Sequence, residues 1–133
     1  MSKTTPSARA RRQLERLGWK VGTVERYCHV TKRRHDLFGF LDLVAIAPGQ
    51  IVGMQVTSDS NYAARLAKVT GECEEPARAW LSAGGVIVVQ SWGLRQKRGS
   101  TRQTWQDRTT QVVVSGGDPS RLVSSPYQFA AQA

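Results

Sequence analysis

Two apolar, β-branched runs near the middle of the chain constrain the fold more than any other feature. They are residues 41–47 (LDLVAIA) and 51–57 (IVGMQVT), and the Pro48-Gly49 pair between them is a turn signal. Short β-branched runs separated by such a pair predict a β-hairpin. Because the two runs are apolar at nearly every position, we expect the hairpin to be buried on both faces.

The segments around this hairpin predict helices and further strands. Apolar residues at helical spacing indicate a helix from Ser7 that Gly18 ends, and two more helices between the hairpin and residue 85. We expect strands at residues 19–30, 86–92 and 104–114, and a basic turn at Lys32, Arg33 and Arg34 after the first of them. The last two strands would form a long hairpin with a basic loop at its tip.

These elements predict an α/β (α+β) protein with a mixed central β-sheet flanked by helices. A strand that comes straight after a helix indicates a helix crossing over the sheet. A chain of 133 residues that is 40% hydrophobic suits one packed core, so we predict a single domain over residues 1–115. Residues 116–133 are rich in Gly, Ser and Pro and predict a tail, either disordered or docked through Leu122, Tyr127 and Phe129.

Sequence features outside this core indicate a soluble, cytoplasmic protein. No apolar run approaches the ~18 residues of a membrane span, and the basic N-terminus lacks the apolar stretch of a secretory signal. The two cysteines, Cys28 and Cys73, are too few for a disulfide scaffold. Together with His29 and His35 they lack zinc-site spacing, so we do not expect zinc.

The positive charge is concentrated and suggests a polyanionic partner. The net charge is +9, and residues 1–34 contain ten basic groups against two acidic ones. Clustered cations attract a phosphate backbone, although a solubilising surface is the simpler alternative. The residues expected to contact DNA, branched or duplex, are Arg9, Arg11, Arg12, Lys32, Arg33, Arg34, Arg95, Lys97, Arg98 and Arg102.

Asp42 is a carboxylate inside an otherwise apolar run, where burial is costly unless something compensates it. With a two-residue or four-residue connection in the hairpin, Asp42 faces Gln55, and Thr57 shares their face of the sheet. A three-residue loop would instead set Asp42 against Val56 and move Gln55 to the opposite face. The polar grouping therefore depends on the register.

If Asp42 and Gln55 meet, they offer the oxygen ligands that Mg²⁺ (or Mn²⁺) prefers, with the backbone carbonyl of Val56 as a further ligand. Such a site beside a basic surface suggests phosphodiester hydrolysis. The alternative is structural: Asp42 would be a strand-end acid capped by backbone N–H groups, and Gln55 an ordinary strand residue.

The segment HDLFGFLDLVAIAPGQIVGMQVTSDSN resembles the core of the PD-(D/E)XK nuclease superfamily, particularly its Holliday-junction-resolvase-like and phage-borne branch, and the resemblance spans residues 7–89. It implies a restriction-endonuclease-like core of order αβββαβ and a homodimer. Asp42 matches the family's second-strand aspartate, and Gln55 occupies the place of the acid on the third strand. Glu15 corresponds to a first-helix glutamate that completes the metal site.

Two positions depart from the family pattern. Gln55 is neutral where the family has an acid, and Thr57 replaces the lysine that would orient the attacking water. Lys68 is the nearest candidate for a displaced lysine, although it suits a solvated helix face equally well. Asp36 is a further acid that the site would use, whereas Glu15 also suits an exposed ion pair with Arg11.

These observations favour a divalent-metal-dependent DNA endonuclease of resolvase-like type. A DNA-binding protein with a degenerate nuclease core is the second hypothesis, because it would explain Gln55 and Thr57. A basic structural or inhibitor protein that acts on a protein partner is the third.

Overall fold

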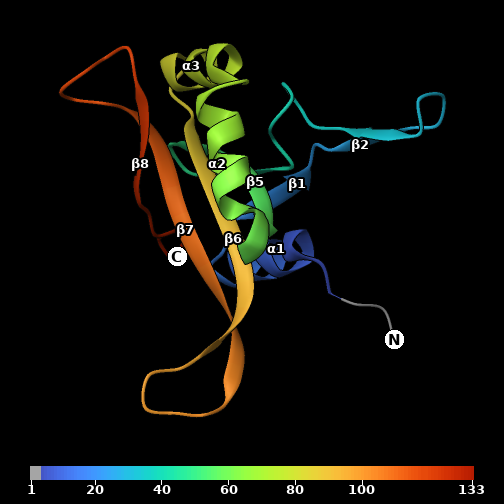
Figure 1. Cartoon of the computed structure of the whole chain (residues 1–133), viewed down its shortest axis with the longest axis vertical. Coiled ribbons are helices and arrows are strands. Elements are labelled where there is room, and N and C mark those ends of the chain that lie inside the picture. Colours follow the sequence, from blue (N-terminus) through green and yellow to red (C-terminus); the bar gives the residue numbers. More distant parts are fainter. Residues whose placement is uncertain (1–3) are drawn as a thin grey trace.

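The computed structural model describes residues 4–133, and its centre is a six-stranded mixed sheet (Figure 1). The strand order is β1-β4-β5-β6-β7-β8; β5 and β6 are parallel, and the other neighbours are antiparallel. The bounds are β1 (Lys20–Thr23), β4 (Leu43–Ala47), β5 (Gln50–Ser58), β6 (Val86–Gln96), β7 (Gln103–Val114) and β8 (Leu122–Pro126). Two further strands, β2 (Arg26–Cys28) and β3 (Arg33–His35), form a separate two-stranded ribbon.

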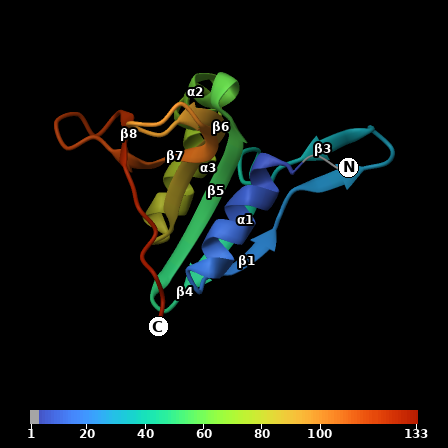
Figure 2. The ribbon, with the colours of Figure 1, turned by 90° about the horizontal axis from the view of Figure 1, so that it is seen from below.

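Helices cover both faces of the sheet. Helix α1 (Pro6–Arg16) lies on one face, and α2 (Tyr62–Thr70) and α3 (Glu74–Ser82) follow the 3-10 turn Asp59–Asn61 on the other, as Figure 2 shows on either side of β5. The mixed α/β architecture predicted from the sequence is therefore confirmed. The helices α2 and α3 make the crossover between the parallel strands β5 and β6.

The two apolar cores explain why the strand sequences are continuously hydrophobic. Val88 packs in the core under α1, whereas its neighbours Ile87 and Val89 pack in the core under α2 and α3. Successive side chains of a strand point to opposite faces, so a strand between two helical layers needs an apolar residue at every position. The predicted burial of the central hairpin on both faces follows this rule over most of β5.

Local sequence signals define both ends of α1, which begins one residue before the predicted start at Ser7. Thr5 precedes the helix and accepts a hydrogen bond from the backbone N–H of Ala8 at 3.1 Å, which satisfies one of the free donors of the first turn. Pro6 occupies the first turn, and Gly18 follows the helix with a φ of +88°. Ala10 and Leu14, the predicted apolar positions, are fully buried.

The prediction of one strand over residues 19–30 is wrong. The segment forms β1 in the main sheet and then β2 in the ribbon, and the basic segment predicted to be a turn forms β3. Beyond Val24 the sequence is polar and basic and has no apolar set with which to join the core. It pairs instead with residues 33–35, which are equally polar.

The C-terminal segment contains more structure than predicted. Strand β8 pairs with β7, and Leu122 and Phe129 are buried while Tyr127 packs against the same core as Phe129. Of the two alternatives for this segment, the structure supports docking through the three predicted residues, and strand β8 is an element that was not predicted. The edge of β7 supplies backbone partners, so the strand forms although its own sequence has little periodicity.

No helix among residues 4–133 has the length and apolarity to cross a bilayer.

Phe129→Ala should lower the free energy of unfolding by about 3 kcal/mol, because a buried phenylalanine leaves a cavity when truncated. Phe129 is 6% exposed, and its ring packs edge-on against Trp19 with centroids 5.2 Å apart. Urea unfolding measures the effect. The matched control is Phe38→Ala at a side chain that is 57% exposed, for which a change below about 1 kcal/mol is expected. Equal losses in the two variants would contradict docking of the C-terminal segment.

Candidate metal centre

The hairpin of β4 and β5 adopts the register on which the predicted polar grouping depends. Ala47 pairs with Gln50 across the two-residue turn, and Leu43 pairs with Met54. The backbone N–H of Asp42, just before β4, donates to the carbonyl of Met54 at 2.8 Å, and the side chain of Asp42 accepts a hydrogen bond from the side chain of Gln55. Asp42 and Gln55 therefore meet, as the two-residue connection predicts.

Asp42 is buried and accepts two hydrogen bonds at one carboxylate oxygen. Its Oδ2 accepts from the side-chain Nε2 of Gln55 and from the backbone N–H of Val56, both at 2.8 Å. Burial raises the pKa of Asp42 to about 7; the Val56 N–H opposes this rise, and the negative charges of Asp36 and Glu25 add to it. The side chain is thus a carboxylate that gives up its proton only near neutral pH.

Two further carboxylates meet Asp42. One oxygen of each of Glu25, Asp36 and Asp42 lies within 4.8 Å of the others. Glu25 immediately precedes β2 and Asp36 immediately follows β3, so the legs of the ribbon bring both acids to the end of the β4–β5 hairpin. Three oxygens at this spacing are compatible with joint coordination of one hard cation.

The side-chain oxygen of Gln55 provides a second observation, independent of the carboxylates, that fits a cation at this cluster. The side chain is 3% exposed, and its Oε1 has no hydrogen-bond partner among the described residues. Turning the amide about its last, soft torsion would bring Oε1 to the place from which Nε2 now donates to Asp42. Three carboxylates and this amide oxygen make an all-oxygen donor set, so the residues present fit Mg²⁺ or Mn²⁺.

The cluster opens into a cleft of about 550 Å³ between the first turn of α1, the end of β5 and one face of α2. Val56 and Thr57 form part of its floor, and Lys68 and Arg65 reach it from α2. Arg34 also lines the cleft and pairs with Glu25 at 3.0 Å. The cleft therefore combines an acidic floor with three basic side chains on its walls.

Among the predicted site residues, Asp36, Asp42, Gln55, Val56 and Lys68 come together in this cleft. Glu15 does not: it is exposed on α1, and its nearest ionic partner is Arg11 at 3.9 Å. The alternative of an exposed ion pair is therefore the one that the geometry supports for Glu15.

Glu25 was not predicted from the sequence. It is the third carboxylate of the cluster, the position that was expected for Glu15. Glu25 and Asp36 are opposite each other only if residues 26–28 pair with residues 33–35. This pairing was not expected, because the two segments were predicted to be part of a strand and a turn. Charges on both sides of a tight turn at residues 29–32 would have been the signal.

Several of the basic residues assigned to DNA have structural partners instead. Arg95 forms a two-pronged pair with Asp59, at 2.6 and 3.0 Å, and this pairing lowers the pKa of Asp59. Arg11 donates to the carbonyl of Val21 and to Thr23, and Arg9 stacks on the ring of Trp105 at 3.8 Å. The predicted DNA-contacting cations that are exposed are Arg12, Lys32, Arg33, Arg34, Lys97, Arg98 and Arg102, and of these Arg34 pairs with Glu25.

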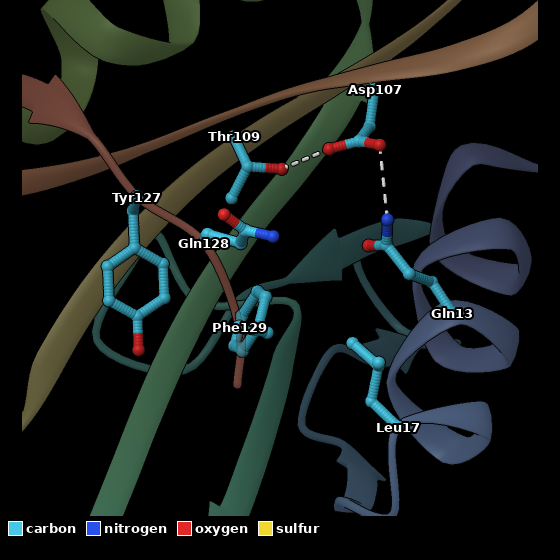
Figure 3. Close-up of a pocket in the computed structure, with 7 residues that line it drawn as sticks. All are labelled: Gln13, Leu17, Asp107, Thr109, Tyr127, Gln128 and Phe129. Carbon is cyan, nitrogen blue, oxygen red and sulfur yellow. Dashed lines mark hydrogen bonds between the residues drawn. The ribbon is translucent and has the colours of Figure 1, made fainter. Parts of the chain in front are cut away.

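A second cavity of about 410 Å³ lies under the C-terminal segment and contains none of the predicted site residues (Figure 3). Asp107 in its wall accepts hydrogen bonds from Gln13 of α1 and from Thr109. Gln13 in turn accepts from Gln90 of β6 at 2.9 Å. These bonds connect α1 with β6 and β7, which gives the acid a structural role.

Comparisons with known proteins identify no family: no family model, no curated protein and no solved structure matches this chain.

Without metal, the free energy of unfolding should fall as the pH rises from about 4 to 7. The folded protein keeps the proton of Asp42 up to about pH 7, whereas an ordinary aspartate loses it near pH 3.8, so protonation favours the folded state throughout this window. Urea unfolding in a chelating buffer at several pH values measures a loss of a few kcal/mol. Asp42→Asn should flatten this dependence, and an unchanged pH profile in that variant would contradict the assignment.

Proposed function

We propose that the chain is a Mg²⁺-dependent DNA endonuclease that hydrolyses phosphodiester bonds. The observation that carries this proposal is the meeting of Asp36, Asp42 and Glu25 beside the unpartnered amide oxygen of Gln55, in a cleft with basic walls. The element order also supports it, since α1, β1, β4, β5, α2 and β6 follow the αβββαβ order of the nuclease superfamily that the sequence resembles.

The side chains of the cleft divide the chemistry between them. The three carboxylates and Gln55 would hold Mg²⁺. The ion would polarise a phosphoryl oxygen and lower the pKa of water, so that a hydroxide nucleophile would be available at neutral pH. Lys68 and Arg65 line the wall of the cleft and are suited to neutralise the charge that develops on the phosphate. Thr57 contributes a hydroxyl but no charge at the position of the family's lysine.

The exposed cations suggest how DNA reaches the cleft. The β2–β3 ribbon carries Lys32, Arg33 and Arg34, and the loop between β6 and β7 carries Lys97, Arg98 and Arg102. Figure 1 shows these two hairpins projecting from the body in different directions. Two separated basic arms suit a duplex or a branched substrate better than a flat basic surface does.

The purified protein should nick or cut branched or duplex DNA in Mg²⁺ or Mn²⁺ and lose this activity in a chelator. Asp42→Asn should reduce the rate by more than about a hundredfold, because it removes the ligand around which the cluster is built. Gel assays on labelled substrates measure both effects. Glu15→Gln is the matched control and should cleave at nearly the parental rate, since Glu15 does not line the cleft. Cleavage that persists in Asp42→Asn would overturn the proposal.

Gln55→Glu should bind Mg²⁺ about tenfold more tightly, because the variant adds a fourth carboxylate to the donor set. In a chelator the same variant should lose about 2 kcal/mol of stability, because Asp42 loses an N–H donor and gains a like charge. Calorimetric titration and urea unfolding measure the two effects. Gln103→Glu, at an exposed position of β7, is the control and should change neither.

A DNA-binding protein with a degenerate nuclease core is the second candidate, and one contact favours it. The Nε2 of Gln55 already donates to Asp42, so Asp42 has a partner without any cation. Salt-sensitive DNA binding without cleavage in any metal would support this candidate. The homodimer implied by the family resemblance is part of either proposal, and light scattering of the purified protein tests it.

A further inference from the structure

The β2–β3 ribbon, residues 26–35, is held to the body mainly at its base. Within the described chain β2 and β3 pair only with each other, and every residue of the ribbon is exposed except the half-buried Cys28. Figures 1 and 2 show the ribbon projecting beyond the sheet and the helices. An isolated two-stranded hairpin is at best marginally stable in water, so the position of this ribbon depends on what happens at its base.

The base of the ribbon is part of the carboxylate cluster. Arg26 pairs with His35. The next residues toward the body, Glu25 before β2 and Asp36 after β3, therefore face each other and converge on Asp42. Like charges at opposed positions repel and push the two legs apart. A divalent cation shared by Glu25 and Asp36 would replace this repulsion with a bridge between the legs.

The rest of the ribbon is chemically matched to a phosphate backbone. It contains four cations, Arg26, Lys32, Arg33 and Arg34, and no acid between residues 26 and 35. Val30 at its tip is 92% exposed, and apolar side chains of this kind can enter a groove of DNA. Arg34 pairs with Glu25 at 3.0 Å, so a cation at Glu25 would compete with Arg34 and leave its guanidinium free to meet a phosphate.

We propose that the β2–β3 ribbon is a DNA-contacting arm whose affinity for DNA is coupled to cation binding by Glu25 and Asp36 at its base. The cation fixes the two legs and releases Arg34, and the ordered arm then binds the phosphate backbone at a smaller cost in conformational entropy. Because coupling between two ligands is reciprocal, bound DNA tightens the cation site to the same extent. This inference rests on the proposed function, since it uses the same cation site and the same substrate.

The decisive experiment measures the affinity for a fluorescein-labelled DNA duplex in Ca²⁺ and in EDTA at equal ionic strength. Ca²⁺ takes the same kind of oxygen ligands as Mg²⁺ and accepts a more flexible coordination geometry. The parental protein should bind DNA about tenfold more tightly in Ca²⁺. In Lys32→Ala/Arg33→Ala this ratio should fall below about twofold, because the arm then contributes little to binding.

Lys97→Ala/Arg98→Ala is the matched control, with two cations removed from the other basic hairpin. It should weaken DNA binding in Ca²⁺ and in EDTA alike and keep the parental ratio, because its loop is not attached to the carboxylate cluster. Retention of the parental ratio in both double variants would overturn the proposal, since simple neutralisation of the cluster by Ca²⁺ would then explain the effect. Equal parental affinity in Ca²⁺ and EDTA would also overturn it, while leaving Mg²⁺-dependent cleavage, and with it the proposed function, intact.

Limited digestion with trypsin tests the arm without DNA. Ca²⁺ should slow cleavage after Arg26, Lys32 and Arg33 severalfold, because bridged legs open less often. Glu25→Gln/Asp36→Asn should remove this protection and leave cleavage after Arg98, in the other hairpin, unchanged. Protection that survives in this variant, or a parental cleavage rate that Ca²⁺ does not alter, would overturn the coupling. Protection in a protein that never cleaves DNA would instead refute the endonuclease and keep the coupled arm.

Discussion

The pairing of β4 with β5 is the constraint on which the candidate metal centre depends. Their two-residue connection sets Leu43 against Met54 and so brings Asp42 to Gln55. A slip of one residue would turn the apolar side chains of one strand from the α1 core to the opposite face, at a cost of several buried side chains. The geometry of a polar site is thus enforced by apolar packing that takes no part in its chemistry.

This packing also makes the negative charge of Asp42 energetically costly. The same burial that fixes Asp42 disfavours its charged form, and one amide and one backbone N–H do not fully compensate it, as its raised pKa indicates. Near neutral pH, Asp42 can therefore either keep its proton or lose the proton and bind a cation. Thr57 adds no positive charge to relieve this balance, so Lys68, Arg65 and Arg34 on the walls are the cations available to the cleft.

The sequence predicted those parts of the fold that local periodicity and turn chemistry determine. The central hairpin, α1 and the long β6–β7 hairpin follow from apolar spacing and from Pro48-Gly49, whereas the sequence allows two registers of the central hairpin and the structure decides between them. Glu25 was missed because its place depends on pairing between two polar segments, whose hydrophobic pattern has no information about register. Strand β8 was missed for a related reason: the free edge of β7 and the anchor Phe129 stabilise it, and neither is local to its sequence.

The net charge of +9 predicts a positively charged surface, but it does not predict which cations lack a partner within the fold. Arg95 is held by Asp59 and Arg11 by the backbone of β1, so part of the positive charge stabilises the fold. Such contacts depend on tertiary distances that composition cannot supply. The cations that stay exposed are concentrated on the two projecting hairpins.

The β2–β3 ribbon has acids at its base and cations along its strands. In the proposed endonuclease, a phosphate backbone drawn in by the cations would be repelled by the uncompensated carboxylates at the point of hydrolysis. A proton on Asp42 relieves part of this repulsion, but it also blocks one ligand oxygen, whereas a divalent cation relieves more of it and uses all three carboxylates. In the proposed function, close approach of DNA and loading of the cation would therefore be mutually dependent, because each would remove the electrostatic obstacle to the other.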